Sequence, residues 1–408
     1  MNQLSQYYKR EKLLIMNNWK DCKLGDAPFE IIDGDRGKNY PKKDEFFESG
    51  YCLFLNTKNV TTNGFKFTEL NFITKEKDER LRKGKLKRYD LVLTTRGTVG
   101  NVGFYNKNIP FDNMRINSGM VIIRPNGINE KFNYQLFKYL KRDFKIFTSG
   151  SAQPQLPIRD LKEISFLFPP LPEQRAIASV LSSLDDKIDL LHRQNRTLEA
   201  MAETLFRQWF VEEAKEDWEE GVLSDEFDFT MGQSPPGDSY NEEGIGIALF
   251  QGNADFGFRF PADRVYTTDS KRFAEKYDTL VSVRAPVGAQ NMAKKKCCIG
   301  RGVAAFRYKY NNSFYTYTYF KLKSLMNEIK QYNETGTVFG SISKSDFQNL
   351  GIKIPPKEEA IKFQKIAKPI DDKIIKNSVQ IRSLEKLRDT LLPKLMSGEV
   401  RVDYNGSS

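Results

Sequence analysis

The sequence predicts an α+β protein in which one mixed module, followed by one long helix, occurs twice. The stretch LSSLDDKIDLLHRQNRTLEA at 181–200 has a counterpart, AKPIDDKIIKNSVQIRSLEK, at 367–386. The chain has 408 residues, and single hydrophobic cores stop growing at roughly 250 to 300 residues. We therefore expect two pseudo-repeated mixed α/β domains joined by two long antiparallel coiled-coil helices.

The internal repeat is long and collinear. FPPLPEQ at 168–174 matches IPPKEEA at 354–360, 186 residues later, and YDLVLTTRGTVG at 89–100 matches YDTLVSVRAPVG at 277–288, 188 residues later. Such self-similarity marks a duplicated structural unit. The expected division is a first module at 1–160, a first helix at 161–212, a second module at 213–347, and a second helix with a C-terminal tail at 348–408.

Both modules show the pattern of short strands between turns. Runs such as DLVLTTRG and GVAAFRYKY are rich in β-branched and aromatic residues, and Gly, Asn and Asp separate them. Aromatic residues also lie beside basic ones at 131–142 and 308–323. An amphipathic helix that buries Phe and Tyr explains these two stretches better than a surface on which nucleotides stack.

The two long helices carry heptad repeats with one apolar seam each. If Asn195 meets Asn377 in an antiparallel pair, Ile188 faces Leu384 and every layer joins an a position to a d position. A buried asparagine pair is a known device for fixing register. The alternative is that each helix packs on its own module. The seam residues proposed for helix pairing are Leu184, Ile188, Leu191, Asn195, Leu198, Ile374, Asn377, Ile381 and Leu384.

The net charge of +11 is unevenly distributed. Residues 1–160 hold 29 basic and 18 acidic side chains, and residues 244–347 hold 16 basic and 8 acidic ones. Two basic blocks indicate two surfaces that face a polyanion. Ordinary solvated lysines are the alternative for a chain with such a pI.

Signals for catalysis, metal binding and membrane insertion are missing from the sequence. The four cysteines show no C-x-x-C spacing, only one histidine is present, and no G-x-G-x-x-G or G-x-x-x-x-G-K-[ST] motif occurs. The N-terminus lacks the apolar core of a signal peptide, and no run approaches the roughly 18 apolar residues of a membrane span. We expect a cytoplasmic, non-catalytic protein with no metal site.

Polar and basic loops are the candidates for DNA contact. The repeated R-G/A-x-V-G, at Arg96–Gly100 and Arg284–Gly288, ends a strand with a cation and a flexible turn, which suits a phosphate or a guanine edge. Pairing of each arginine with an internal carboxylate remains an equal alternative. The candidates are Arg36, Lys38, Lys58, Arg96, Thr98, Arg115, Ser149, Ser151 and Gln153 in the first module, and Gln233, Ser234, Asn253, Arg284, Arg301, Thr335, Ser341 and Ser343 in the second.

A family resemblance rests on the helices and their junctions. FPPLPEQRAIASVLSSLDDKIDLLHRQNRTLEAMAETLFRQWF, with the later copy ending LLPKLMSGEVRV, resembles the specificity subunit of type I restriction-modification enzymes over essentially the whole chain. MGQSPPGDSYNEEGIGIALFQGNADF is similar to the opening of a target recognition domain of that family. In the first domain, DGDRGKNYPKK replaces the usual G-x-[ST]-P pattern.

The resemblance implies a division of labour within a complex. Each target recognition domain reads one half of a bipartite, asymmetric double-stranded DNA target, and the helices set the gap. Two modification subunits that use S-adenosylmethionine dock on the helices, and restriction subunits supply ATP- and Mg-dependent translocation and cleavage. This subunit holds no cofactor. Phe206, Trp209 and Phe210 are expected at the partner interface, or else buried against the second module.

Two other functions compete with this interpretation. One is a related type II-like restriction-modification system, with the chain as its recognition subunit or as a stand-alone nuclease or methyltransferase. Against the stand-alone enzyme, the two repeats leave no room for a catalytic domain. The other is a structural coiled-coil adaptor that does not bind DNA. Salt distinguishes the adaptor, because phosphate contacts make DNA affinity fall steeply between about 50 and 200 mM salt.

Overall fold

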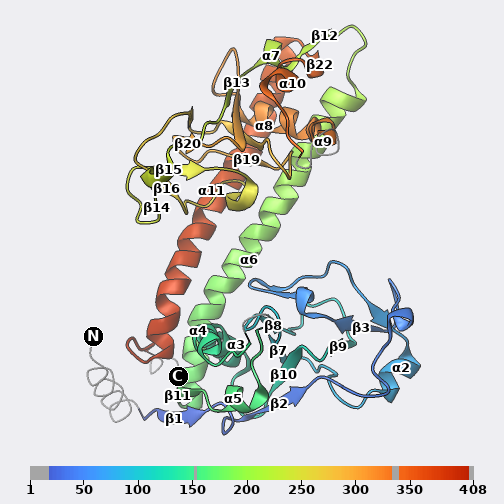
Figure 1. Cartoon of the computed structure of the whole chain (residues 1–408), viewed down its shortest axis with the longest axis vertical. Helices are drawn as coiled ribbons and strands as arrows, with labels where there is room; N and C mark the ends of the chain where they lie inside the picture. Colours follow the sequence, from blue (N-terminus) through green and yellow to red (C-terminus); the bar gives the residue numbers. More distant parts are fainter. Residues whose placement is uncertain (1–17, 151–153, 333–339, 404–408) are drawn as a thin grey trace. The chain divides into compact units, whose positions relative to one another are not determined.

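The computed structural model describes residues 18–150, 154–332 and 340–403 (Figure 1). The chain divides into two compact units, here called unit 1 (Met1–Asp186 with Glu385–Ser408) and unit 2 (Lys187–Leu384). Each unit contains one mixed module of helices and strands and part of both long helices. The predicted fold class, two pseudo-repeated mixed modules with two long helices, is confirmed.

Each module is built on a four-stranded antiparallel sheet with an equivalent strand order. The order is β2-β10-β7-β8 in unit 1 and β13-β21-β18-β19 in unit 2. The third strands, LVLT and TLVS, are buried at every position, which suits strands covered on both faces. The bounds are β2 (Phe29–Asp33), β7 (Leu91–Thr94), β8 (Val102–Phe104), β10 (Met120–Pro125), β13 (Phe227–Met231), β18 (Thr279–Ser282), β19 (Gln290–Met292) and β21 (Val303–Tyr308).

A second sheet in each module repeats one parallel pairing. Strand β3 runs parallel to β9 in unit 1, and β15 runs parallel to β20 in unit 2. The order is β6-β3-β9 in unit 1 and β14-β16-β15-β20-β17 in unit 2, and the pairs β1-β11, β12-β22 and β4-β5 complete the strands. The bounds are β1 (Lys20–Lys23), β3 (Cys52–Leu55), β4 (Val60–Thr61), β5 (Gly64–Phe65), β6 (Phe72–Ile73), β9 (Met114–Ile116), β11 (Ser165–Phe168), β12 (Glu219–Val222), β14 (Tyr240–Asn241), β15 (Ile247–Phe250), β16 (Tyr266–Thr267), β17 (Phe273–Ala274), β20 (Cys297–Ile299) and β22 (Gly351–Ile354).

The two aromatic-rich stretches form helices that face the cores. Phe132 and Phe137 of α3 and Tyr317 and Phe320 of α8 are buried, so these rings are not a stacking surface for bases. The short helices are α2 (Lys75–Arg80), α3 (Glu130–Tyr139), α4 (Lys141–Ile146), α5 (Ile158–Lys162), α7 (Leu223–Glu226), α8 (Tyr315–Ser324), α9 (Met326–Gln331) and α10 (Lys344–Gln348).

Proline and glycine residues lie at the ends of the two long helices. Helix α6 (Leu171–Arg207) carries Pro172 in its first turn, where no backbone hydrogen bond is lost, and continues into a π-helical turn at Gln208–Glu212. Helix α11 (Lys357–Met396) runs past Pro393, and Gly398 adopts a φ of +73° beyond its end. A left-handed glycine is a common helix terminator.

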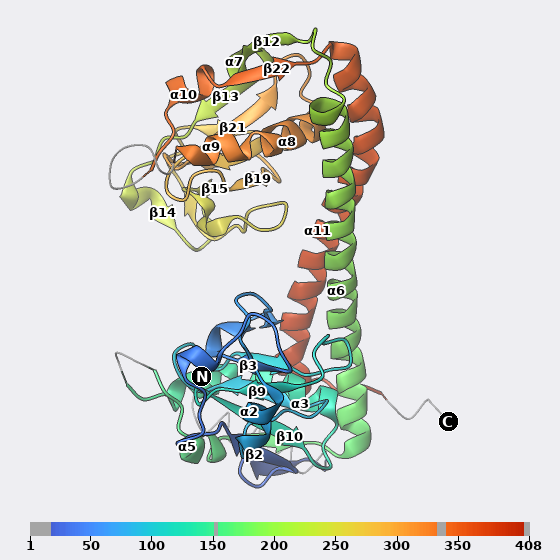
Figure 2. The same cartoon turned by 90° about the vertical axis from the view of Figure 1, so that its right-hand side faces the viewer.

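Within each unit the segments of α6 and α11 pack against each other (Figures 1 and 2). In unit 1, Leu181 shares a buried cluster with Leu395 and Met396. In unit 2, Ile188, Leu191 and Ile381 form another, against which the half-buried Leu384 packs. Residue numbers rise along α6 as they fall along α11, so the pairing inside each unit is antiparallel.

A repeated aspartate ties each helix pair to its module. In unit 1, Asp185 accepts a hydrogen bond of 2.7 Å from Gln135 of α3 and one of 3.1 Å from Arg388 of α11. In unit 2, the equivalent Asp371 lies 3.2 Å from Arg259, a loop residue of the module.

The guanidinium of Arg259 is fully enclosed in unit 2. It also pairs with Glu199 of α6, and it lies 3.9 Å from the ring centroid of Tyr319 in α8. Arg382 of α11 donates to the carbonyls of Phe260 and Pro261 at 2.9 and 2.8 Å, so the loop around Arg259 is held on both helices.

Candidate nucleic-acid interface

Several loops of unit 1 meet at one edge of the four-stranded sheet. The turn between β9 and β10 is fixed by Asn117, whose N–H donates to the carbonyl of Leu55 at 3.0 Å, and by Gly119, whose carbonyl accepts from the N–H of Arg96 at 3.2 Å. The N–H of Gly97 donates to the carbonyl of Pro154 at 3.0 Å. Segments from four distant parts of the sequence therefore form one surface.

The same loops meet in unit 2. The N–H of Gln233 donates to the carbonyl of Ile299 at 3.0 Å, and the N–H of Gly300 donates to the carbonyl of Phe250 at 2.8 Å. The N–H of Val283 donates to the carbonyl of Gly302 at 3.0 Å, next to Arg284. The repeat therefore duplicates this loop edge together with the sheets.

Two glycines make the close packing of this edge possible. A Cβ on Gly34, just after β2, would lie 2.4 Å from the carbonyl oxygen of Asn117, and a Cβ on Gly232, just after β13, would lie 2.1 Å from that of Gly300. No side chain fits at such distances. The next residues, which include Arg36 and Gln233, are thereby brought against the neighbouring turn.

The side chains of the repeated arginines are available at this edge. Arg284 is exposed and Arg96 is half-buried. Within the ranges that the structure describes, neither guanidinium forms a hydrogen bond or an ion pair, so the alternative of an internal carboxylate partner gains no support. Their backbones form bridges to Gln155 and Ser341 respectively.

Most of the other predicted contact residues lie on the same two loop edges. Arg36 reaches the turn of unit 1, where it lies 3.5 Å from the carbonyl of Ser118, and the N–H of Arg301 donates to Ser234 at 3.4 Å in unit 2. The residues brought to these edges are Arg36, Lys58, Arg96, Thr98 and Ser149 in unit 1, and Gln233, Ser234, Asn253, Arg284, Arg301 and Ser341 in unit 2.

The remaining predicted residues have other placements. Lys38 is exposed in the segment after β2. Ser343 caps α10 by accepting a hydrogen bond of 3.2 Å from the N–H of Asp346. Ser151, Gln153 and Thr335 lie outside the described residues.

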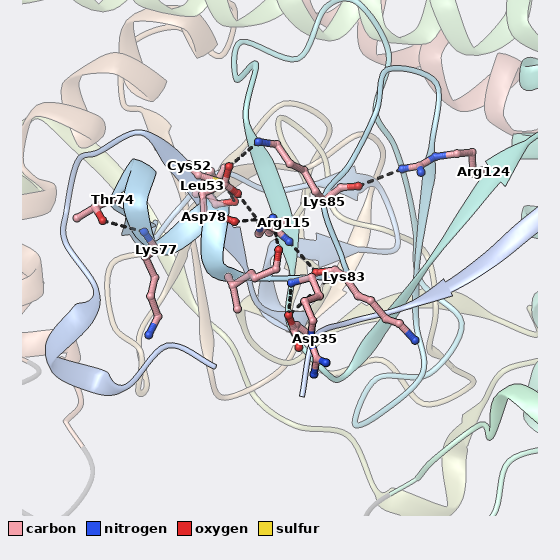
Figure 3. A network of polar contacts seen from close by, with 12 residues as sticks. Asp35, Cys52, Leu53, Thr74, Lys77, Asp78, Lys83, Lys85, Arg115 and Arg124 are labelled. Carbon is pink, nitrogen blue, oxygen red and sulfur yellow. Dashed lines mark hydrogen bonds and ion pairs between the residues drawn. The ribbon is translucent and has the colours of Figure 1, made fainter. Parts of the chain in front are cut away.

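Arg115 must be withdrawn as a DNA contact. Its side chain is 5% exposed and pairs with Asp78, which also accepts from Lys85 (Figure 3). The guanidinium also donates to the carbonyls of Lys83 and Leu81 at 2.7 and 3.0 Å. Arg115 therefore holds α2 and the following loop to the sheet, and its burial keeps the guanidinium away from a phosphate.

The prediction of a partner interface at Phe206 and Phe210 is also wrong. These side chains are 2% and 6% exposed and belong to the core of unit 2. Phe210 packs edge-on against Tyr317 and Phe363, with ring centroids 5.5 and 5.4 Å apart. Trp209 is half-buried against the same cluster. The alternative, burial against the second module, is what the structure shows.

The predicted helix-pairing residues lie along the seam. Asn377 donates to the side-chain oxygen of Asn195 at 2.9 Å, and Asn195 donates to the hydroxyl of Ser378 at 3.2 Å. Ile188, Leu191, Ile374 and Ile381 are buried, whereas Leu184, Leu198 and Leu384 are half-buried. The asparagine pair from which the register is counted is thus in direct contact.

Two exposed cations beside Arg36 were missed. Asp35 accepts hydrogen bonds from the N–H groups of Arg82 and Lys83, at 2.6 and 3.4 Å, and these residues line a surface hollow together with Arg36. The density of basic residues in RLRKGKLKR, 80–88, is the sequence signal that could have identified them.

The described residues offer no cluster for a metal ion, and two of the buried thiols are held in the protonated form. None of their His, Cys, Asp and Glu side chains cluster in a way that could hold a metal ion. Burial raises the pKa of Cys52 and that of Cys297 to about 12, so both thiols stay protonated near neutral pH. Within the same ranges, every helix is too short or too polar to cross a bilayer.

Comparisons with known proteins agree on one family. The family described as "Type I restriction modification DNA specificity domain" matches residues 16–200 and 215–386. A putative type I restriction enzyme MjaX specificity subunit of Methanocaldococcus jannaschii is 30% identical over 98% of this chain and 99% of its own length. The type I restriction enzyme HindI specificity subunit of Haemophilus influenzae is 23% identical over 94% of this chain and 100% of its own length.

A solved structure supports the fold. The crystal structure of a type I restriction-modification system S subunit from M. genitalium aligns with a TM-score of 0.60 at 20% sequence identity. The alignment covers 93% of this chain and 96% of that one. At this identity the likeness shows a shared fold.

Proposed function

We propose a molecular role from one premise: this chain belongs to the type I restriction modification DNA specificity family. It is the DNA sequence-specificity subunit of a type I restriction-modification complex, and it assembles there with its partner subunits and with DNA. Each of the two modules reads one half of a bipartite, asymmetric target in double-stranded DNA.

The duplicated loop edge is the observation that carries this proposal. In each unit, one edge of the four-stranded sheet gathers polar and basic side chains from several loops, with the cations Arg96 and Arg284 at equivalent places. Guanidinium groups can read guanine in the major groove or bind phosphates, and neighbouring amides and hydroxyls can contact bases. Two such edges suit two half-sites.

The long helices are the proposed spacer. A straight helix of 37 residues measures about 55 Å, which exceeds the roughly 34 to 36 Å of one DNA turn. We assign the docking of two modification subunits to the exposed helix faces. Restriction subunits complete the complex in the cytoplasm.

Catalysis is assigned to the partner subunits. S-adenosylmethionine, ATP and Mg²⁺ belong to them under this proposal, and the present subunit contributes recognition alone. The absence of nucleotide-binding motifs from the sequence supports this division.

Binding by the assembled complex tests the role. The complex should bind DNA with an affinity that falls steeply between about 50 and 200 mM salt, and it should methylate one bipartite motif in cellular DNA. A complex that neither binds DNA nor marks a defined motif contradicts the proposal and favours the adaptor alternative.

Replacement of the repeated arginines tests the loop edges. Arg96→Ala and Arg284→Ala should each weaken DNA binding by about 1 to 3 kcal/mol and leave the thermal unfolding midpoint nearly unchanged, because the described residues give neither guanidinium a partner. Fluorescence anisotropy and thermal unfolding of the same preparations measure both quantities. Parallel losses of affinity and stability would mean that these arginines are structural.

A further inference from the structure

A basic segment follows α2 in unit 1 and has no equivalent in unit 2. Residues 80–88, RLRKGKLKR, hold six basic side chains and no acidic one. The corresponding residues of the repeat, 268–276, hold three basic and two acidic side chains. The segment therefore contributes to the asymmetry in charge between the modules.

Of these six basic side chains, two form ion pairs with described residues and four do not. Lys85 pairs with the buried Asp78, and Arg88 pairs with Asp112 at 2.7 Å while its guanidinium lies over the ring of Tyr105. In contrast, the side chains of four cations form no hydrogen bond or ion pair with any described residue, and all four are exposed. These are Arg80, Arg82, Lys83 and Lys87.

The backbone of this segment is held rigidly, so the free cations project from a fixed support. Arg115 donates to the carbonyls of Leu81 and Lys83, and Asp35 accepts from the N–H of Arg82 at 2.6 Å (Figure 3). Leu81 and Leu86 are buried beneath the segment. The positions between these anchors face solvent.

Two of the free cations, Arg82 and Lys83, adjoin the loop edge assigned to DNA. Arg82 and Lys83 line one surface hollow with Arg36, whose guanidinium lies 3.5 Å from the carbonyl of Ser118 in the β9–β10 turn. The two carboxylates of the hollow are already engaged, because Asp33 pairs with Arg36 at 3.1 Å and Asp35 binds backbone N–H groups. The net charge of the side chains that line the hollow is therefore positive.

We propose that Arg80, Arg82, Lys83 and Lys87, here called the basic strip, bind backbone phosphates of DNA beside the half-site that the first module reads. This inference rests on the proposed function. The ligand is phosphate rather than base edges, because the strip offers flexible cations without amides or hydroxyls, and phosphate contacts position a protein without reading sequence. The strip makes the two modules unequal: unit 1 supplies more of the salt-dependent affinity.

The test compares two double variants in the full assembled complex. Arg82→Gln with Lys83→Gln removes two charges of the strip. Lys271→Gln with Arg272→Gln is the matched control at the corresponding place of unit 2, where Lys271 already pairs with Asp269 at 2.7 Å. Dissociation constants are measured between about 50 and 200 mM salt on DNA with the mapped motif and on DNA of the same length without it.

The strip variant should lower the slope of log affinity against log salt by about 1 per residue, hence by about 2 in all. Affinity should fall by the same factor on both DNAs, and the methylated motif should be unchanged. The control should keep the wild-type slope.

Three outcomes overturn the inference. They are an unchanged slope for the strip variant, a loss confined to motif-containing DNA, which would indicate base reading, and loss of subunit assembly, which would indicate that the strip binds a protein partner. A wild-type complex that binds both DNAs equally contradicts the proposed specificity function instead. The change in slope remains measurable in that case.

Discussion

Arg115 and Arg284 look alike in the sequence, as single cations within strand-and-turn segments, yet they have opposite environments. Arg115 is enclosed with Asp78, whereas Arg284 is exposed, and its side chain has no partner among the described residues. Asp78 lies 37 residues away in the chain, so no local pattern announces the pairing. The role of a cation here follows from its tertiary neighbours.

Loss of Arg115 should therefore affect folding. Arg115→Met leaves the carboxylate of Asp78 buried with only Lys85 beside it, and breaking a buried pair in this way costs about 3 to 5 kcal/mol. The double variant Asp78→Asn with Arg115→Met should recover part of that loss. Urea unfolding monitored by circular dichroism measures both, and a single variant as stable as wild type contradicts the assignment.

Glu226 gives a pH-dependent prediction. Burial raises the pKa of this carboxyl, and the hydroxyl of Tyr317 donates to it at 2.6 Å. The folded state therefore holds a proton that the unfolded state releases, and stability falls as pH rises from the ordinary pKa of Glu through the raised one.

Glu226→Gln should remove this dependence. Its thermal midpoint should match wild type near the ordinary pKa of Glu and exceed it as the pH rises through the raised pKa, as measured by differential scanning fluorimetry. The exposed Asp228→Asn is the control and should show no such divergence.

At the level of elements, the seam between α6 and α11 in unit 2 has one polar layer. Asn195 and Asn377 are both buried, and they hydrogen-bond to each other among apolar neighbours such as Leu191 and Ile381. The heptad pattern predicted this layer because both asparagines occupy seam positions. The pattern could not show that Ser378 would join the network.

The asparagines should be strongly coupled. Asn377→Leu alone leaves the amide of Asn195 short of a partner and should cost about 1 to 3 kcal/mol. Asn195→Leu with Asn377→Leu should restore much of that stability, because it removes both polar groups. A double-mutant cycle from urea unfolding gives the coupling energy, and additive effects would show that the pair does not act as a unit.

For the whole molecule, the internal repeat predicted the two modules, and the heptad periodicity predicted the two long helices. The repeat offsets implied two equivalent modules, and the strand orders of the two four-stranded sheets agree. The sequence could not predict which side chains turn inward: Arg115 reaches across to Asp78, and Phe206 and Phe210 close the core of unit 2. These outcomes depend on contacts between segments far apart in the chain.

Lengthening both helices should lengthen the gap between the two half-sites. An insertion of seven residues in each of 189–194 and 378–383 keeps the heptad seam and adds about 10 Å, which corresponds to about three base pairs. Sequencing of methylated bases in cells that carry the complex measures the gap. An unchanged gap contradicts the role of the helices as the spacer.

Asp185 and Asp371 have different partners. Exchange of the first module by recombination therefore has a different consequence from exchange of the second. Asp185 pairs with Lys138 of the first module and with Arg388 of α11, and Arg388 stays in place when the first module is exchanged. Asp371 depends on Arg259, which leaves with the second module. A recombinant whose second module carries no arginine at that loop would leave Asp371 buried without this cation, which would lower the stability of unit 2.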